Sequence, residues 1–156
     1  EDSFIYSYGH RNPQGLAWDD SGRLWSTEHG RTAKDEVNLI EAGNNYGWPD
    51  FIGDETAQGI TEPFLHSGSV TWAPSGAAIK DGSFYFAGLR GQTLYELDIS
   101  EEDPVLKKYL EKQFGRLRAV VLGPDDFLYV LTSNRDGRGV PLAADDRVLR
   151  IDAEKL

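Results

Sequence analysis

Residues 10–30 read HRNPQGLAWDDSGRLWSTEHG, with two short apolar segments on either side of a turn that contains Gly22. Polar residues stand at both outer ends of the stretch. A hairpin with arms of similar length brings its ends back together, because each strand residue advances the chain by about 3.3 Å. We therefore expect Arg11, Asn12 and Gln14 to lie beside residues 28–30.

The same pattern occurs three times along the chain. Apolar pairs follow each turn, at residues 24–25, 84–85 and 128–129. When Gly22, Gly82 and Asp126 are aligned, the polar positions also align. Arg11, Thr71 and Arg116 stand 10 or 11 residues before the turn residue, and Gly30, Arg90 and Asn134 stand 8 residues after it. Three hairpins with polar residues at the same end are typical of a radial repeat with one functional face.

The composition excludes several classes of protein. The formal net charge of −10 argues against nucleic acid or an anionic membrane as partner. No apolar run reaches the length of a membrane-spanning helix, and no signal peptide is visible. The chain contains no Cys, which excludes disulfides and thiolate metal sites. It also contains no Met and begins at Glu1, so we expect a processed or excised product.

The pattern predicts an all-β fold of about 12 strands. We expect strands near 4–8, 14–19, 23–28, 36–41, 68–72, 76–80, 83–88, 93–98, 107–113, 117–122, 127–132 and 146–152, with a long loop insertion at about 42–66. The turns at 82 and 126 are 44 residues apart, which matches one propeller blade. The turns at 22 and 82 are 60 apart, which matches one blade plus the loop. Residues 1–156 are therefore predicted to form a single unit of about three four-stranded blades, half of a six-bladed β-propeller.

Three blades do not close a ring, because propellers use about four to eight. The predicted strands begin with the outer strand of one blade and end with the third strand of another. We therefore expect either a homodimer, in which two copies join head to tail and cover their edge strands, or a complementary N-terminal half of the propeller.

The motifs in these repeats resemble those of the soluble PQQ-dependent glucose/aldose sugar dehydrogenases (the glucose/sorbosone dehydrogenase family), which are six-bladed propellers that use pyrroloquinoline quinone (PQQ) and calcium. The similar segments are GHRNPQGL at 9–16, EHG at 28–30, DEVNLI at 35–40, NYGWP at 45–49, APSG at 73–76, LRG at 89–91, RLR at 116–118 and YVLT at 129–132. They cover nearly the whole chain, but match only the C-terminal half of the family's propeller.

The resemblance implies a set of cofactor and metal residues. Arg11 and Asn12 match positions that contact the quinone and position the sugar, and His29 stands against the cofactor. The residues that match contacts to the cofactor carboxylates are Thr71, Arg90, Arg116 and Arg118. The main-chain carbonyls of Gly30 and Arg31 match ligands of the calcium that polarises the quinone, and Glu36 with the carbonyl of Tyr46 resembles a second, structural calcium site.

The chain departs from the family pattern at three of these positions. Arg31 stands where Pro is common, which places a cation beside a calcium site. Arg90 replaces a frequent Lys, so the charge stays while the donor geometry changes. Ser133 stands where an acidic side chain is frequent.

The chemistry of the residues is consistent with this implied site. PQQ is a planar tricarboxylate, and arginines provide paired donors for carboxylates. Calcium prefers the hard oxygen ligands that loop carbonyls and Glu provide. Each residue also has a structural interpretation: a rim ion pair for Arg11, a hydrogen-bonded histidine for His29, a solvated strand edge for Arg116 and Arg118, and a turn cap for Glu36.

In the family a histidine of the N-terminal half removes the sugar hydroxyl proton, and no histidine of this sequence matches it. We therefore expect part of a cofactor site for an aldose sugar substrate, without a catalytic base, and little or no activity of the chain alone. The alternative is a non-catalytic propeller fragment that assembles with itself or with a partner. A calcium-dependent lactonase-type propeller is a third possibility, against which the arginine cluster and residues 10–14 argue. The resemblance also implies a periplasmic or secreted location.

Overall fold

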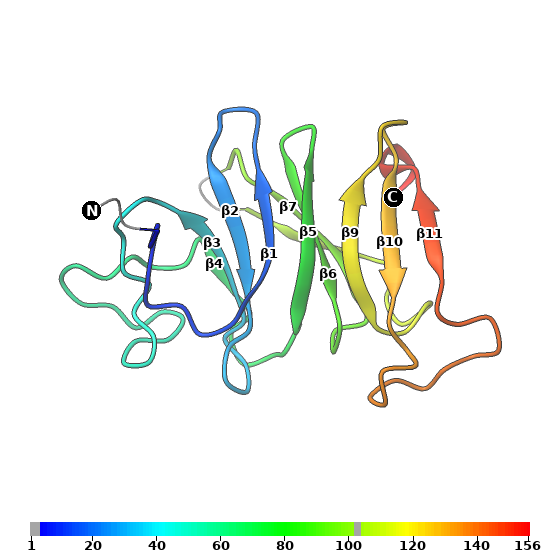
Figure 1. Cartoon of the computed structure of the whole chain (residues 1–156), viewed down its shortest axis with the longest axis horizontal. Coiled ribbons are helices and arrows are strands. Elements are labelled where there is room, and N and C mark those ends of the chain that lie inside the picture. The colour runs from blue at the N-terminus through cyan, green and yellow to red at the C-terminus, as the bar shows by residue number, and fades with distance from the viewer. Residues whose placement is uncertain (1–3, 102–103) are drawn as a thin grey trace.

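The computed structural model describes residues 4–101 and 104–156, and it consists of three antiparallel sheets (Figure 1). The first sheet contains β1 (Pro13–Trp18), β2 (Leu24–Glu28), β3 (Glu36–Ile40) and β4 (Leu65–His66). The second contains β5 (Pro74–Lys80), β6 (Ser83–Gly88), β7 (Thr93–Asp98) and β8 (Leu106–Tyr109), and the third contains β9 (Leu117–Leu122), β10 (Leu128–Thr132) and β11 (Val148–Ile151). Each sheet is one propeller blade with its strands in chain order, so the prediction of half a β-propeller is confirmed.

Helical structure in the described residues is limited to the short 3₁₀ helix Ala153–Lys155, and no helix there has the length or apolarity to cross a membrane.

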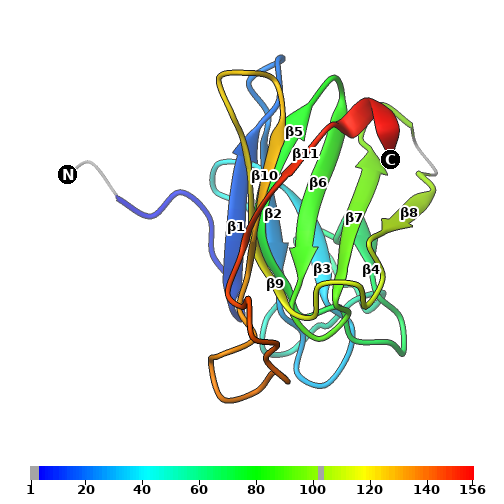
Figure 2. The ribbon, with the colours of Figure 1, turned by 90° about the vertical axis from the view of Figure 1, so that its right-hand side faces the viewer.

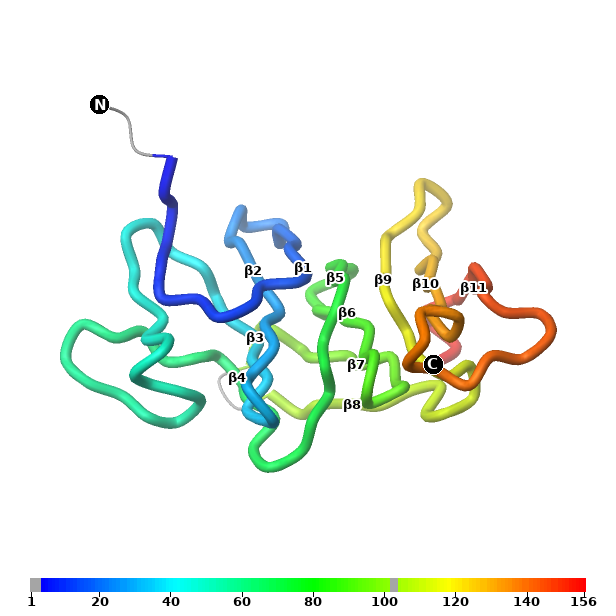
Figure 3. Tube along the Cα trace, turned by 60° about the horizontal axis from the view of Figure 1, so that its bottom comes forward, coloured from blue at the N-terminus to red at the C-terminus, as the bar shows by residue number. Residues whose placement is uncertain are grey.

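The three blades fan around one line, with the first strand of each blade innermost. Strands β1, β5 and β9 lie next to one another in Figure 3, and β5 contacts both of the others. The apolar core lies between the sheets. Trp25, Phe84 and Phe86 are fully buried between the first two blades, while Leu117 and Val130 belong to a second cluster between the last two. Burial of such large side chains provides the main stabilisation of the fold.

A glycine near the start of β1 and of β5 lets neighbouring inner strands approach closely. A Cβ atom added to Gly15 would lie 2.5 Å from the Ser75 carbonyl oxygen, and one added to Gly76 would lie 2.9 Å from the Ala119 Cα. A side chain of β2 also links β1 to β5 by hydrogen bonds. The Thr27 hydroxyl accepts from the Gly15 N–H and donates to the Ser75 carbonyl. Each glycine stands two residues after a proline, where the register of the strand pairing is irregular.

The hairpin turns and the connecting loops lie at opposite ends of the blades (Figure 1). Gly22, Gly82 and Asp126, which stand at equivalent turns, have φ values of 78°, 77° and 65°. This left-handed conformation suits glycine, and aspartate adopts it more readily than most other residues. The loops after β2, β6, β8 and β10 gather at the other end, which we call the loop end.

The structure corrects several predicted strand boundaries. Residues 4–8 form no strand: they lead away from the sheets in Figure 2, and Tyr8 makes an isolated bridge with Asn45. Strand β1 is an edge strand of its blade and pairs only with β2, and residues 4–8 pair with neither edge strand of that blade. Residues 68–72 are also not a strand, because Gly68 has φ +61° and the Val70 N–H closes a turn on the Ser67 carbonyl.

The described residues therefore form 11 strands instead of about 12, and the third blade has three. The fourth strand of the first blade is the short β4, which begins just before the expected end of the 42–66 loop. The segment 107–113 provides β8 only as far as Tyr109.

Candidate functional site

A cavity of about 520 Å³ opens at the loop end, with lining residues from all three blades. It brings together eight of the predicted site residues: Arg11, Asn12, His29, Gly30, Arg31, Thr71, Arg90 and Arg116. Glu36 and Tyr46 line a separate, smaller cavity, and Arg118 lines neither of the two. The resemblance implies nine of these residues around the cofactor and its calcium, of which eight line the cavity, and it implies a second calcium site for Glu36 and Tyr46.

The large cavity is strongly cationic although the chain as a whole is acidic. Five arginines line it: Arg11, Arg31, Arg90, Arg116 and Arg138. Asp35 also lines the cavity, but it is only 2 % exposed, and its two oxygens accept three backbone N–H groups, from Gly30, Trp72 and Ala73, at 2.7–2.9 Å. Clefts lined by charge of one sign concentrate the field and attract ligands of the opposite sign. The geometry therefore suits an anionic ligand.

A buried carboxylate holds the loop that carries Arg11 and Asn12. Glu28, at the end of β2 and 3 % exposed, accepts the backbone N–H groups of both residues through Oε1. Its Oε2 lies 3.0 Å from Nδ1 of His10, whose ring stacks on Tyr46. The Arg11 guanidinium is thereby placed over the Trp48 ring and donates to the His29 carbonyl at 3.1 Å. Glu28 thus fixes the backbone from which both side chains enter the site.

Contacts across the first and second blades hold one side of the cavity. The His29 ring donates from Nε2 to the Pro74 carbonyl at 2.6 Å, so this nitrogen is engaged within the protein. The Thr71 hydroxyl donates to the Thr32 carbonyl at 2.6 Å. Together with Asp35, these bonds join the loop after β2 to the segment before β5. His29 and Thr71 therefore have structural contacts as well as a place in the lining.

Arg116 is the buried cation of the cavity, 8 % exposed. Its guanidinium donates to the carbonyls of Ser133 and Leu89 and lies 2.8 Å from Asp136. Arg118, which is outside the lining, lies 3.6 Å from the same carboxylate. The Arg138 backbone N–H and the Arg116 guanidinium lower the pKa of Asp136, so this acid stays ionised. Asp136 thus supplies, three residues later, the acid that the sequence lacks at Ser133.

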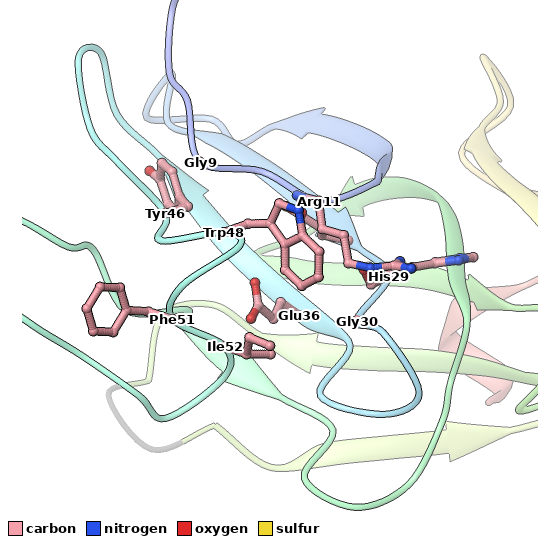
Figure 4. Close-up of a pocket in the computed structure, with 10 residues that line it drawn as sticks. Gly9, Arg11, His29, Gly30, Glu36, Tyr46, Trp48, Phe51 and Ile52 are labelled. Carbon is pink, nitrogen blue, oxygen red and sulfur yellow. Dashed lines mark hydrogen bonds between the residues drawn. The ribbon is translucent and has the colours of Figure 1, made fainter.

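The smaller cavity, of about 10 Å³, has room for a water molecule or a single ion. Figure 4 shows Glu36, Trp48 and Ile52 around it, with Arg11 next to Trp48. Burial raises the pKa of Glu36, although its oxygens accept from the Gly53 N–H and the Asn38 amide. Asn38 Oδ1 is buried and has no hydrogen-bond donor within the described part of the chain. Glu36 is thus a buried acid that a cation in this cavity would stabilise, while Asn38 bonds to it from outside the lining.

Four residues with a role here were not identified from the sequence: Glu28, Asp35, Asp136 and Arg138. Asp35 stands inside the segment 35–40, in which only Glu36 was assigned a role. Arg138 lies in the loop after β10, between Gly137 and Gly139, and a basic residue in a glycine-rich loop at the functional end is a signal that would have identified it.

The comparisons with known proteins agree with this architecture. The family model for glucose/sorbosone dehydrogenases matches residues 1–144. The PQQ-bound aldose sugar dehydrogenase of Streptomyces coelicolor has a TM-score of 0.89 and 42 % identity over 94 % of this chain and 44 % of its own. An aldose sugar dehydrogenase of Escherichia coli is 32 % identical over 85 % of this chain and 42 % of its own length.

A shorter match has higher identity. The quinoprotein glucose dehydrogenase B of Acinetobacter calcoaceticus is 55 % identical over 51 residues, which is 33 % of this chain and 11 % of that protein. The chain spans less than half the length of each of these relatives. The extent of the family match and the three-blade architecture agree, and the chain belongs to the glucose/sorbosone dehydrogenase family.

Proposed function

We propose that this chain forms part of a PQQ- and calcium-dependent aldose (glucose-type) sugar dehydrogenase and carries part of its cofactor site. The observation that carries the proposal is the 520 Å³ cavity, lined by five arginines from three blades in a chain of net charge −10. A planar tricarboxylate needs several cations on converging loops, and this is the set that the cavity presents. The PQQ-bound relative supports the choice of cofactor.

Arg90 and Arg116 would hold cofactor carboxylates, since both line the cavity and come from neighbouring blades. Arg118 would assist from outside the lining through Asp136, which it shares with Arg116. Arg11 and Asn12, whose backbone Glu28 holds, would position the reacting carbon of the sugar. Thr71 and His29 would form the adjoining part of the cavity wall. When bound, PQQ supplies the hydride acceptor for oxidation of the sugar hydroxyl carbon.

Two sites fit calcium by the chemistry of their donors. The described residues contain no cluster of three His, Asp or Glu side chains, so main-chain carbonyls would supply most ligands. The carbonyls of Gly30 and Arg31 would serve a cation in the large cavity. Glu36 and the Tyr46 carbonyl would serve one in the small cavity, where burial of Glu36 favours positive charge.

We propose that the chain alone oxidises no sugar, because none of its histidines matches the general base of the family. His10 bonds Glu28 and Ser7, and His29 donates to a carbonyl. His66 accepts the Gly68 N–H at Nδ1, away from the cavity lining. A general base must reach the hydroxyl proton directly. His10 and His66 lie outside the lining of the large cavity, and His29 in that lining is held by the Pro74 carbonyl. The family relationship supports a periplasmic or secreted location.

Titration of the chain with PQQ and Ca²⁺ tests the proposal. We expect one PQQ to quench tryptophan fluorescence, since Trp48 is next to Arg11. Ca²⁺ at a hundredfold excess over its dissociation constant should stabilise the fold by about 2.7 kcal/mol. Glu36→Gln should remove the part of this shift that comes from the small cavity, whereas Glu62→Gln, at an exposed position outside it, should not. Absence of PQQ binding with Ca²⁺ present would contradict the proposal, and dye reduction with glucose would contradict the inactivity.

A second candidate, assembly of half-rings, is favoured by the apolar faces of the end blades. On the first blade Leu16 and Trp18 are 55 % and 63 % exposed, on the face opposite the core. On the last blade Val121, Leu131 and Val148 are exposed. Contiguous apolar surface of this kind marks an interface. We infer that both faces pack against a second set of three blades, which two copies of this chain would supply to each other.

Sedimentation velocity tests this pairing. We expect a species of about twice 17.4 kDa, lost on Trp18→Lys, with unchanged circular dichroism because the Trp18 side chain lies outside the core. Lys108→Gln, which changes an exposed residue of β8, should leave the mass unchanged. A 17.4 kDa monomer at every concentration would exclude the homodimer.

A further inference from the structure

Two arginine side chains in the large cavity have no role in the proposed cofactor site. Arg31 stands in the loop after β2 and Arg138 in the loop after β10. Both are exposed, and within the described residues neither guanidinium makes a hydrogen bond or an ion pair. Arg116 in the same lining is engaged by three acceptors, and Arg11 is held by a carbonyl and an indole. Arg31 and Arg138 therefore keep their donors free for a ligand.

Their positions place one free cation on each side of the cavity. The loop after β2 belongs to the first blade and the loop after β10 to the last, and both reach the loop end on either side of the second blade (Figure 1). A ligand that enters the cavity therefore meets a guanidinium from each flank. The backbone carbonyl of Arg31 has a proposed role toward calcium, but its side chain has none.

The charges in the cavity exceed what the cofactor can neutralise. Five arginines line it, while the Asp35 carboxylate is satisfied by backbone N–H groups and Asp136 balances part of the Arg116 and Arg118 pair. In the proposed site, Arg90 and Arg116 would pair with PQQ carboxylates from the lining, while Arg118 would act from outside it through Asp136. Calcium would add two further positive charges. With both groups bound, the entrance therefore stays cationic at Arg31 and Arg138.

From this surplus we infer that the sugar is an anionic aldose, with a carboxylate or phosphate on the carbon far from the oxidised hydroxyl. The inference rests on the proposed function and names its substrate class. A neutral sugar would leave both guanidiniums with water alone, whereas an acidic sugar would gain charge-assisted, paired hydrogen bonds from one or both. The cationic field would also speed the encounter of an anion with the cavity.

NMR titration of the PQQ- and Ca²⁺-loaded chain with D-glucose, D-glucuronate and D-glucose 6-phosphate tests the inference. We expect at least one acidic sugar to bind roughly tenfold more tightly than glucose, with an affinity that falls as salt rises. Arg31→Gln and Arg138→Gln should each weaken binding of the acidic sugar about three- to tenfold, and Arg138→Gln should leave binding of glucose unchanged. Lys108→Gln, which removes the same charge from an exposed site outside the lining, should change neither. The preferred acid identifies the group as carboxylate or phosphate.

PQQ binding is measured first in each variant, because it distinguishes failure of the proposed function from failure of the substrate inference. If the unchanged chain does not bind PQQ, the proposed function is wrong and this inference falls with it. If PQQ binds normally but the three sugars bind equally, the inference alone is wrong. The inference is also wrong if Arg31→Gln and Arg138→Gln leave the affinity for acidic sugars as high as Lys108→Gln does.

Discussion

Replacement of Asp35 by alanine is expected to lower the free energy of unfolding by about 3–5 kcal/mol. The carboxylate accepts the N–H groups of Gly30, Trp72 and Ala73, and it is almost completely buried. Alanine would leave these donors without a partner, and a buried unsatisfied donor costs about 1–3 kcal/mol. Because the donors come from two blades, the loop after β2 would also separate from the segment before β5.

Urea denaturation followed by tryptophan fluorescence measures this effect. Asp50→Ala is the matched control, because Asp50 is exposed and its carboxylate makes no hydrogen bond in the described structure. We expect the control to change stability by less than about 0.5 kcal/mol. A loss of less than about 1 kcal/mol in Asp35→Ala would show that water satisfies these N–H groups, and that Asp35 does not hold the cavity wall.

Replacement of Arg116 by alanine is expected to weaken PQQ binding about a hundredfold and to reduce stability by about 2–3 kcal/mol. Its guanidinium bonds two carbonyls and the Asp136 carboxylate from a buried position. The substitution removes the proposed cofactor contact and leaves Asp136 with the Arg138 N–H and the more distant Arg118. Asp136 would then repel an anionic ligand, which adds to the loss of affinity.

Arg90→Ala separates binding from stability. Arg90 is exposed in the same lining, and its side chain has no partner within the described residues. PQQ affinity should therefore fall about tenfold while the unfolding midpoint stays unchanged. Arg150→Ala removes a surface pair with Asp125 beyond the cavity and should leave PQQ affinity intact. Equal PQQ affinity in the Arg90 and Arg150 variants would contradict the assignment of Arg90.

Local sequence patterns predicted most of the fold, because the two inner strands of each blade form a hairpin closed by a short turn. Alternation of apolar residues and a left-handed turn residue are properties of neighbouring positions, and they place β1–β2, β5–β6 and β9–β10 correctly. Residues 4–8 have the same β-prone composition but form no strand. The outcome there depends on whether a distant sheet edge is available, which composition does not encode.

The cavity was predictable only where its residues sit at fixed distances from a hairpin turn. Arg11, Arg90 and Arg116 do so, and they meet in the lining. Arg138 and Asp136 belong to the long loop after β10, whose path depends on contacts such as the Arg116–Asp136 pair. Side-chain pairing of this kind depends on three-dimensional approach, so residue spacing alone places neither the extra arginine nor its neighbouring acid.

The close approach of inner strands at Gly15 and Gly76 has a geometric consequence for the whole wheel. The distance between adjacent innermost strands, together with the wedge angle between blades, fixes the circumference of the central channel. A Cβ atom at Gly15 or Gly76 would meet the backbone of the next inner strand, so the two strands would have to move apart. The absence of side chains at Gly15 and Gly76 thus helps to set how closely the inner strands pack around the axis.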